Sequence, residues 1–149
     1  MSRWQELDPE KKENLAKALQ TVDFLAAFGP DNITTLLDGA QMRDFEPGEV
    51  ILLKGEISEA LYVIGSGKAV VCLKKDPKVL NRSDYFGEMS LFLKRAVSCT
   101  VKASEEGVHV LAVPGKLLKD LVQANRKAKD LVQAKMRDRG IGSEEKKKK

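Results

Sequence analysis

The sequence predicts a single domain that is mainly β, with α-helices on both sides of the β part. Apolar residues recur at helical spacing within 1–41, short β-rich runs alternate with turn residues within 42–113, and helical spacing returns within 114–139. A chain of 149 residues has room for one core. Its hydrophobic share of 42% and charged share of 32% are ordinary for a globular protein.

The N-terminal segment, 1–41, is expected to contain two helices. Asp8 can cap the first helix, and Pro9 suits its first position. The apolar face of this helix follows at helical spacing, with Leu15, Leu19, Val22, Phe24, Leu25 and Phe28. Gly29-Pro30 ends the helix, and Asp31 is expected to cap a second one that runs to about Ala40.

The central segment, 42–113, has the residue pattern of a compact all-β unit. Turn-forming clusters rich in Gly, Pro and Asp lie at 46–49, 54–56, 65–67 and 75–78. Strands are expected between them, at 50–53, 61–64, 69–73, 98–101 and 108–113. Many short strands about 8–12 residues apart indicate a sandwich, barrel or jelly roll. The stretch 86–93 lacks alternation and is expected to form one helical turn.

The C-terminal segment, 114–139, is expected to be helical. Pro114-Gly115 ends the strands, and the leucines and valines of 117–136 predict a long amphipathic helix. The hexapeptide KDLVQA occurs at 119–124 and again at 129–134. An offset of ten residues is not a whole number of helical turns, so the two copies are expected to face different ways.

Positive charge is concentrated at the C-terminal end. Residues 114–149 carry 12 Lys and Arg against 5 Asp and Glu, whereas 1–113 carry 14 against 17. Residues 140–149 are predicted to be a disordered basic tail. Contact with nucleic acid, anionic lipid or an acidic partner is one interpretation, and a solvated helix face with a disordered lysine run is the simpler one. Nucleic acid is an unlikely partner, because no aromatic residues interleave with these lysines.

Several classes of protein are excluded by composition. No apolar run approaches the 18 residues of a membrane span, and the N-terminus has no apolar leader, so a cytoplasmic location is expected.

Cys72 and Cys99 lie in apolar runs and are predicted to be reduced and buried; two cysteines are too few for a zinc site or a disulfide framework. The single histidine, His109, is expected on a strand surface, without a metal or catalytic role. No enzyme and no metal or other cofactor is therefore predicted.

Gly87 and Glu88 carry the clearest chemical signal. A glycine before a short helical turn lets the backbone approach a ligand and directs free N–H groups at an anion. The Glu88 carboxylate can accept hydrogen bonds from sugar hydroxyls. An ordinary strand-to-helix turn is the alternative interpretation of this pair alone.

Five motifs in order extend that signal: 45–51 (FEPGEVI), 54–56 (KGE), 61–71 (LYVIGSGKAVV), 84–91 (DYFGEMSL) and 98–103 (SCTVKA). Together they resemble the cyclic nucleotide-binding domain family. The resemblance implies a β-roll (jelly roll) with N-terminal helices and C-terminal lid helices that move when cyclic AMP or cyclic GMP binds. It also implies a phosphate-binding cassette at 86–100.

The resemblance assigns expected roles to single residues. Glu88 would bind the ribose 2′-hydroxyl, and the backbone of Gly87, Met89 and Ser90 would face the cyclic phosphate. Ser98 would lie near the phosphate and, in cyclic GMP binders, the guanine. Phe86 opens the cassette, and the candidates for an apolar wall around the base are Val71, Leu73 and Leu80.

The cassette departs from the family pattern at one position. The family places Pro-Arg where this chain has Ala96-Val97, and that arginine is the family's main phosphate ligand. A hydrogen bond to a charged group contributes about 1.5–3 kcal/mol, so the expected loss of affinity is roughly ten- to a hundredfold. Arg95 lies two positions earlier, and in an extended chain its side chain would leave on the same face as that of Val97, about 6–7 Å away.

Two functions follow as hypotheses. The first is a regulatory domain that senses cAMP or cGMP, with weakened affinity, and relays the signal through its C-terminal helix to a kinase or other protein effector. The second is a degenerate member that binds no nucleotide and acts as a protein-interaction or structural module. The Gly87-Glu88 pair favours the first hypothesis and the absent arginine favours the second. The sequence leaves the choice between cAMP and cGMP open.

Overall fold

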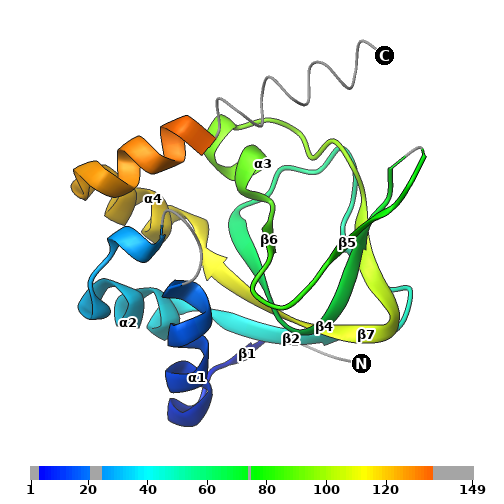
Figure 1. The fold of residues 1–149 in the computed structure, drawn as a ribbon, viewed down its shortest axis with the longest axis horizontal. Helices are drawn as coiled ribbons and strands as arrows, with labels where there is room; N and C mark the ends of the chain where they lie inside the picture. Colours follow the sequence, from blue (N-terminus) through cyan, green and yellow to red (C-terminus); the bar gives the residue numbers. More distant parts are fainter. Residues whose placement is uncertain (1–3, 21–24, 74, 136–149) are drawn as a thin grey trace.

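A computed structural model describes residues 4–20, 25–73 and 75–135 of the chain. It has a curled β-roll with helices gathered beside it (Figure 1). The strands are β1 (Gln5–Glu6), β2 (Gln41–Phe45), β3 (Val50–Leu52), β4 (Ala60–Val71), β5 (Lys78–Leu80), β6 (Tyr85–Phe86) and β7 (Val101–Pro114). The helices are α1 (Pro9–Gln20), the 3₁₀ turn η1 (Leu25–Ala27), α2 (Pro30–Gly39), α3 (Glu88–Leu93) and α4 (Gly115–Ala124), and residues 126–135 are also helical. The predicted fold class is confirmed.

One antiparallel sheet forms the roll, in the order β1-β2-β7-β4-β5, with β3 paired to β7 and β6 paired to β4. The long strands β4 and β7 pair along most of their length, and their register shifts near residue 65 and again near residue 68. Gly67 and Gly107 both have φ of +77° at this bend, and a Cβ on Gly67 would lie 2.5 Å from the Gly107 carbonyl oxygen. The turn predicted at 65–67, between separate strands at 61–64 and 69–73, is therefore wrong, because the glycines bend one continuous strand instead of ending it.

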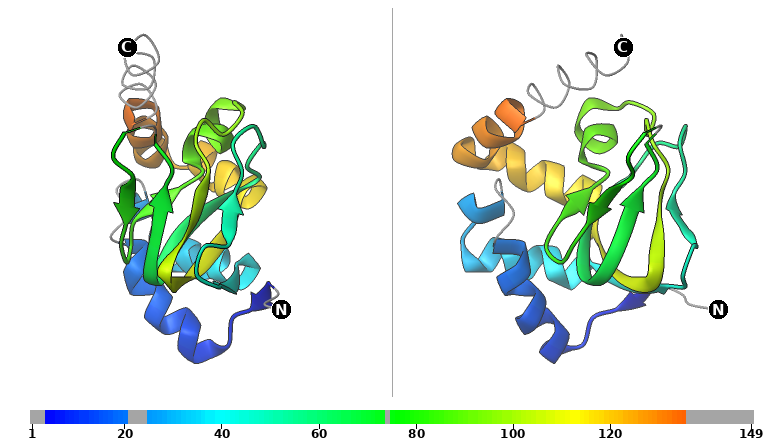
Figure 2. Two further views of the ribbon diagram at one scale, coloured as in Figure 1. Left: turned by 90° about the vertical axis from the view of Figure 1, so that its right-hand side faces the viewer. Right: turned by 45° about the vertical axis from the view of Figure 1, so that its right-hand side comes forward.

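Two apolar clusters make up the core. Figure 2 shows the helices gathered at one end of the curled sheet. The helical cluster joins these helices to β4 and β7, and the buried residues of the roll cluster all come from the strands. The buried members of the helical cluster are Leu7, Leu15, Leu19, Leu25, Phe28, Ile33, Leu36, Leu37, Ala40, Leu61, Val63, Leu91, Leu111, Val113, Leu118, Val122, Ala128 and Val132. The roll cluster contains Phe45, Leu52, Ile64, Ala69, Leu80, Phe86, Val101, Ala103, Val108 and Val110, with Trp4, Ile51, Tyr62, Val71 and Val97 packed against it.

The helix boundaries differ from the prediction in three places. The first helix was expected to continue to Phe28, but α1 ends at Gln20 and Leu25–Ala27 forms the separate 3₁₀ turn η1. The N-cap of α2 is Gly29 and its first residue is Pro30, so Asp31 lies in the first turn and is not the cap. The predicted long C-terminal helix is interrupted at Asn125, whose side chain accepts from the Ala128 N–H and donates to the Ala27 carbonyl oxygen. Asn125 thus caps a new helical segment and ties it to η1.

That break changes how the repeated hexapeptide is used. Val122 of the first copy and Val132 of the second are both buried in the helical cluster, with exposures of 3% and 6%. The two copies therefore bury the same position, and the expectation that they face different ways is wrong. The reason is that the spacing argument assumed one uninterrupted helix.

The cysteines are unpaired, but neither is buried. Cys72 is exposed and Cys99 is half-buried, because Cys72 follows Val71 and so leaves the sheet on the opposite face from the roll cluster. His109 is exposed as predicted, and its Nδ1 contacts the Asp44 carboxylate across β2 and β7.

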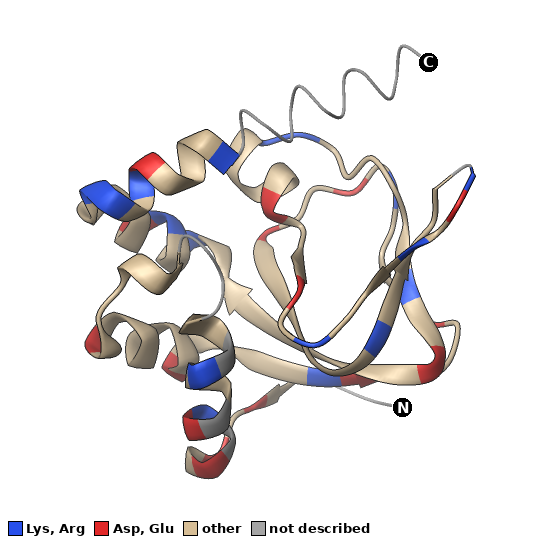
Figure 3. Ribbon diagram, viewed as in Figure 1, with Lys and Arg blue, Asp and Glu red and all other residues tan. Residues whose placement is uncertain are grey.

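Lys and Arg outnumber Asp and Glu on the C-terminal helices, and exposed examples are Lys116, Arg126 and Lys127 (Figure 3). No helix in the described ranges is long and apolar enough to cross a membrane. The predicted tail at 140–149 lies outside the described residues, as do Val22 and Phe24.

Candidate functional site

Gly87 turns the chain from β6 into α3. Its φ of +87° lies in the left-handed region, which side-chain-bearing residues rarely adopt. A Cβ at this position would lie 3.0 Å from the Ser58 hydroxyl, 3.1 Å from the Tyr62 ring and 3.2 Å from the Ala60 carbonyl oxygen. The close approach of the segment that leads into β4 therefore requires glycine here, independently of any ligand.

The helical turn expected after Gly87 is α3, and its polar side chains face inward. The Leu91 N–H donates to the Gly87 carbonyl oxygen at 3.1 Å, which closes the first turn. Glu88 and Ser90 are each 3% exposed. The Ser90 hydroxyl accepts from the Ser58 N–H at 2.7 Å, so it fastens α3 to the segment before β4. A buried carboxylate, that of Glu88, thus lies at the start of α3, next to the roll.

The loop 94–100 after α3 holds Val97 in place by its backbone. The Val97 N–H donates to the Glu56 carbonyl oxygen at 2.7 Å, and the Gly55 N–H donates to the Val97 carbonyl oxygen at 2.8 Å. The half-buried Val97 side chain packs against the roll cluster. Arg95 and Ser98 are exposed.

The expectation that Arg95 and Val97 share a face assumed an extended strand. The strand begins only at Val101, so the loop before it does not alternate regularly, and the two side chains have different surroundings. The predicted strand at 98–101 is thus wrong except for its last residue.

Aromatic rings connect the cassette to the rest of the roll. Tyr62 and Phe86 stack with ring centroids 5.3 Å apart, and Trp4 lies 6.1 Å from Tyr62 and 5.9 Å from Phe45. Burial raises the pKa of Tyr62 above its ordinary value, and the negative charges of Glu56 and Glu59 raise it further. Both of these glutamates are exposed, so burial remains the main cause of the raised pKa of Tyr62.

The candidate base-wall residues are only partly brought together. Val71 and Leu80 belong to the roll cluster. Leu73 lies beyond the end of β4, where its N–H bonds the Val71 carbonyl oxygen at 3.0 Å, and it is not part of that cluster.

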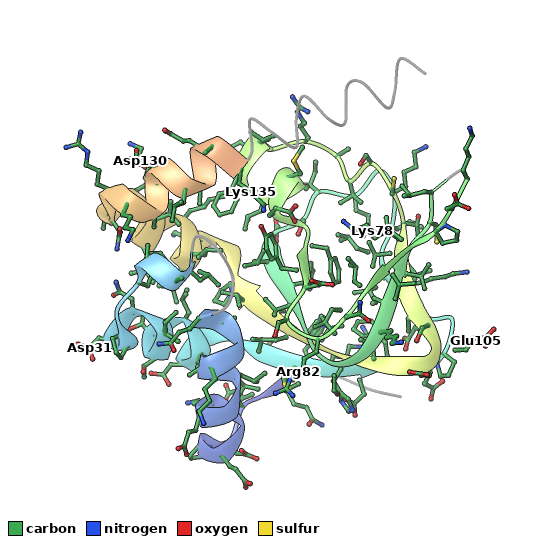
Figure 4. The ribbon with its side chains drawn as sticks, in the orientation of Figure 1. Asp31, Lys78, Arg82, Glu105, Asp130 and Lys135 are labelled. Carbon is green, nitrogen blue, oxygen red and sulfur yellow. The ribbon has the colours of Figure 1, made fainter. Side chains whose placement is uncertain are left out.

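Lys78 is a side chain that the sequence reasoning missed. It is paired directly with Val71 in the register of β4 and β5, and it lies on the same face of β5 as the buried Leu80. Lys78 is itself exposed, and Figure 4 draws it in front of or behind the roll in this view, whereas Glu105 lies at the periphery of the molecule. Side chains alternate between the two faces of a strand, so the expectation that Leu80 faces the base implies that Lys78, two residues earlier, lies on the same face. This alternation is the sequence signal that would have identified Lys78.

The side chains gathered around the start of α3 and the inner face of the roll are suited to binding a ligand. One buried carboxylate, an apolar inner surface and one lysine at its edge can bind a ligand that has hydroxyls and a flat ring. Within the described part of the chain, no group of three or more His, Cys, Asp and Glu side chains is placed to hold a metal ion.

Comparison with known proteins points to one family. The family model for the "Cyclic nucleotide-binding domain" matches residues 42–125, more than half of the chain. A cGMP-dependent protein kinase of Eimeria tenella is 34% identical over 93 residues, which are 62% of this chain and 9% of the kinase. The chain thus spans about a tenth of that relative's length.

Solved structures share the fold at low sequence identity. The regulatory domain of Toxoplasma gondii PKA, solved with cAMP, gives a TM-score of 0.72 at 21% identity, covering 82% of this chain and 49% of that one. A regulatory subunit of a cAMP-independent protein kinase A from Trypanosoma cruzi, bound to guanosine, gives 0.72 at 18% identity, covering 80% and 43%.

Proposed function

The chain belongs to the cyclic nucleotide-binding domain family, and we propose on that basis that it binds cAMP or cGMP inside the roll and relays binding to a protein effector. The observation that carries the proposal is the buried Glu88 carboxylate directly after the left-handed Gly87. In this proposal Glu88 binds the ribose 2′-hydroxyl, and the backbone of Gly87, Met89 and Ser90 faces the phosphate. Phe86 and Ser98 border the ligand, and Val71 and Leu80 contact the base.

A contact between α3 and α4 supports the relay. Leu91 of α3 is buried in the helical cluster together with Leu118 and Val122 of α4. The Gly115 N–H, at the start of α4, donates to the Glu59 carbonyl oxygen at 2.9 Å. A shift of α3 on ligand binding would therefore press directly on α4 and on the helical segment that follows it.

The position of Lys78 favours cGMP as the ligand. An ammonium group donates hydrogen bonds and accepts none. Guanine presents two acceptors, O6 and N7, on the edge where adenine presents one acceptor and a donor. A lysine beside the base-wall residues Val71 and Leu80 therefore suits guanine better.

The proposed effector is a protein kinase in the cytoplasm, as the family's kinase relatives suggest. The domain itself would have no catalytic role. The unpaired Cys72 and Cys99 suit a reducing compartment. The alternative, a module that binds protein and no nucleotide, is favoured by Val97 alone.

Calorimetric titration of the purified chain with cGMP and cAMP tests the proposal. We expect saturable binding of both ligands, and a loss of about ten- to a hundredfold in affinity on Glu88→Gln, because the amide cannot replace a charged acceptor. Glu105→Gln, at an exposed site away from α3, is the matched control and should leave affinity unchanged. Absence of binding at millimolar ligand would support the interaction module instead.

A further inference from the structure

The predicted cassette contains three hydroxyl-bearing residues, and they differ in how accessible their hydroxyls are. Ser90 is 3% exposed, and its hydroxyl accepts from the Ser58 N–H. Thr100 is half-buried, and its hydroxyl accepts from the Lys54 N–H at 3.0 Å. Ser98 is exposed, and its hydroxyl has no hydrogen-bond partner within the described part of the chain. Ser98 therefore offers the accessible hydroxyl of the cassette.

Two cations precede Ser98 at a defined spacing. Arg95 lies three residues before it and Lys94 lies four residues before it. Both are exposed, and neither forms an ion pair with another described residue. Arg95 is also the only arginine of the sequence that has Ser or Thr three residues after it. A serine/threonine kinase with carboxylates in its substrate cleft selects a hydroxyl by cations at such positions.

The segment around Ser98 is fastened to the rest of the domain at one residue. Residues 94–99 lie outside the helices and strands, and among them only Val97 has backbone hydrogen bonds to another segment, at 2.7 and 2.8 Å to the loop at 55–56. The Val97 side chain is half-buried against the roll cluster. These contacts of one residue are what the segment has to give up, by local opening, to place Ser98 in a kinase cleft.

The loop 94–100 is positively charged as it stands. It carries Lys94 and Arg95 and no acidic residue. A phosphate on serine brings a charge of about −1.5 to −2 at pH 7, which offsets both cations. In the proposed function this loop borders the ligand phosphate, so an anionic ligand would lose the attraction of the loop once Ser98 is phosphorylated.

We infer that Ser98 is a phosphorylation site for a serine/threonine kinase with an acidic substrate cleft, and that phosphate on Ser98 weakens the binding of a cyclic nucleotide. The Ser98 hydroxyl oxygen forms a bond to the γ-phosphorus of ATP, the bond from that phosphorus to the β,γ-bridging oxygen breaks, and ADP leaves. The hydroxyl proton passes to a carboxylate of the kinase. The effect on ligand binding rests on the proposed function, whereas the modification itself does not.

The first experiment incubates the purified full chain with ATP, Mg²⁺ and the catalytic subunit of protein kinase A as the acidic-cleft probe. We expect phosphate on Ser98, located by fragmentation mass spectrometry. Arg95→Ala should lower kcat/KM for transfer to Ser98 about tenfold or more, because a charge-assisted contact to the kinase is lost. Arg82→Ala, at another exposed arginine, is the matched control and should leave kcat/KM unchanged.

The second experiment titrates the phosphorylated and the unmodified chain with cGMP by calorimetry. At low salt, we expect the affinity of the phosphorylated chain to be about three- to tenfold lower. The difference should shrink at about 1 M salt, where the Debye length is only about 3 Å and exposed charges are screened.

Each result decides a different claim. The modification site is overturned if the folded chain takes up no phosphate on Ser98, whether or not a synthetic peptide of residues 91–103 does. Equal kcat/KM for the unaltered chain and Arg95→Ala would overturn it too, because charge would then not select the site. Equal cGMP affinities of the two forms would refute the effect on binding and leave the proposed function standing. Absence of cGMP binding to the unmodified chain would refute the proposed function and this effect together, while the mass spectrum still decides the modification.

Discussion

Gly87 and Gly48 provide a matched pair at the residue scale. Both have positive φ, +87° and +80°, but a Cβ would meet three atoms within 3.2 Å at Gly87 and nothing within 4 Å at Gly48. We expect Gly48→Ala to lower the free energy of unfolding by about 1–2 kcal/mol through backbone strain alone. Gly87→Ala should cost about 2–4 kcal/mol, since overpacking against β4 adds to that strain. Urea denaturation measures both, and equal losses would mean that the close approach at Gly87 is unimportant.

Tyr62 gives stability a defined dependence on pH. Its pKa in the folded state is raised above the ordinary value of 10.0, chiefly by burial. As pH rises above 10.0, the unfolded chain loses this proton before the folded chain does, so the unfolded state becomes favoured. The contribution of protonated Tyr62 to the free energy of unfolding is complete below pH 10.0 and is lost as the pH rises through the folded-state pKa.

The matching variant is Tyr62→Phe, which cannot ionise. The unfolding free energy of the unaltered chain should fall relative to that of the variant as the pH rises above 10.0, as urea titrations at stepped pH would record. Parallel pH profiles for the two proteins would show that Tyr62 ionises equally well in the folded and unfolded states.

At the scale of elements, the start of α4 packs so closely against the roll that residue 115 has to be glycine. A Cβ on Gly115 would lie 2.3 Å from the Glu59 carbonyl oxygen and 2.4 Å from Leu91 Cδ1. Gly115→Ala should therefore push α4 from its place and cost about 1–3 kcal/mol or more. Gly29→Ala, at a site with nothing within 4 Å, should cost less than about 1 kcal/mol. Thermal unfolding of the two variants makes the comparison, and a mild Gly115→Ala would mean that α4 can shift freely.

On the scale of the whole molecule, the helical cluster joins the N-terminal helices α1 and α2 to the helical segment 126–135. Val132 is buried together with Leu19 and Leu36 of the N-terminal helices. Val132→Asp should lower the free energy of unfolding by about 2–4 kcal/mol, because a carboxylate would enter an apolar core. The neighbouring exposed residue supplies the control: Gln133→Asp should stay within about 0.5 kcal/mol. Equal effects in urea denaturation would mean that the 126–135 segment does not pack on the N-terminal helices.

The sequence by itself determined the order of elements and the residues of the cassette. Asp8-Pro9 and Pro114-Gly115 marked the first helix start and the end of the strands, and Gly87-Glu88 marked a strand-to-helix turn. These signals are local, because capping, proline geometry and periodicity act over a few residues. Val97 was found in the same way, by its place in a motif.

Only the tertiary structure decided how distant segments use those residues. Whether Gly65-Ser66-Gly67 ends a strand depends on β7, which lies beside it and continues the pairing. Lys78 became a candidate ligand contact only through its register with Val71. The positions of Arg95 and Val97 depend on backbone bonds from the loop at 55–56. Such contacts join residues tens of positions apart, and periodicity within one segment carries no information about them.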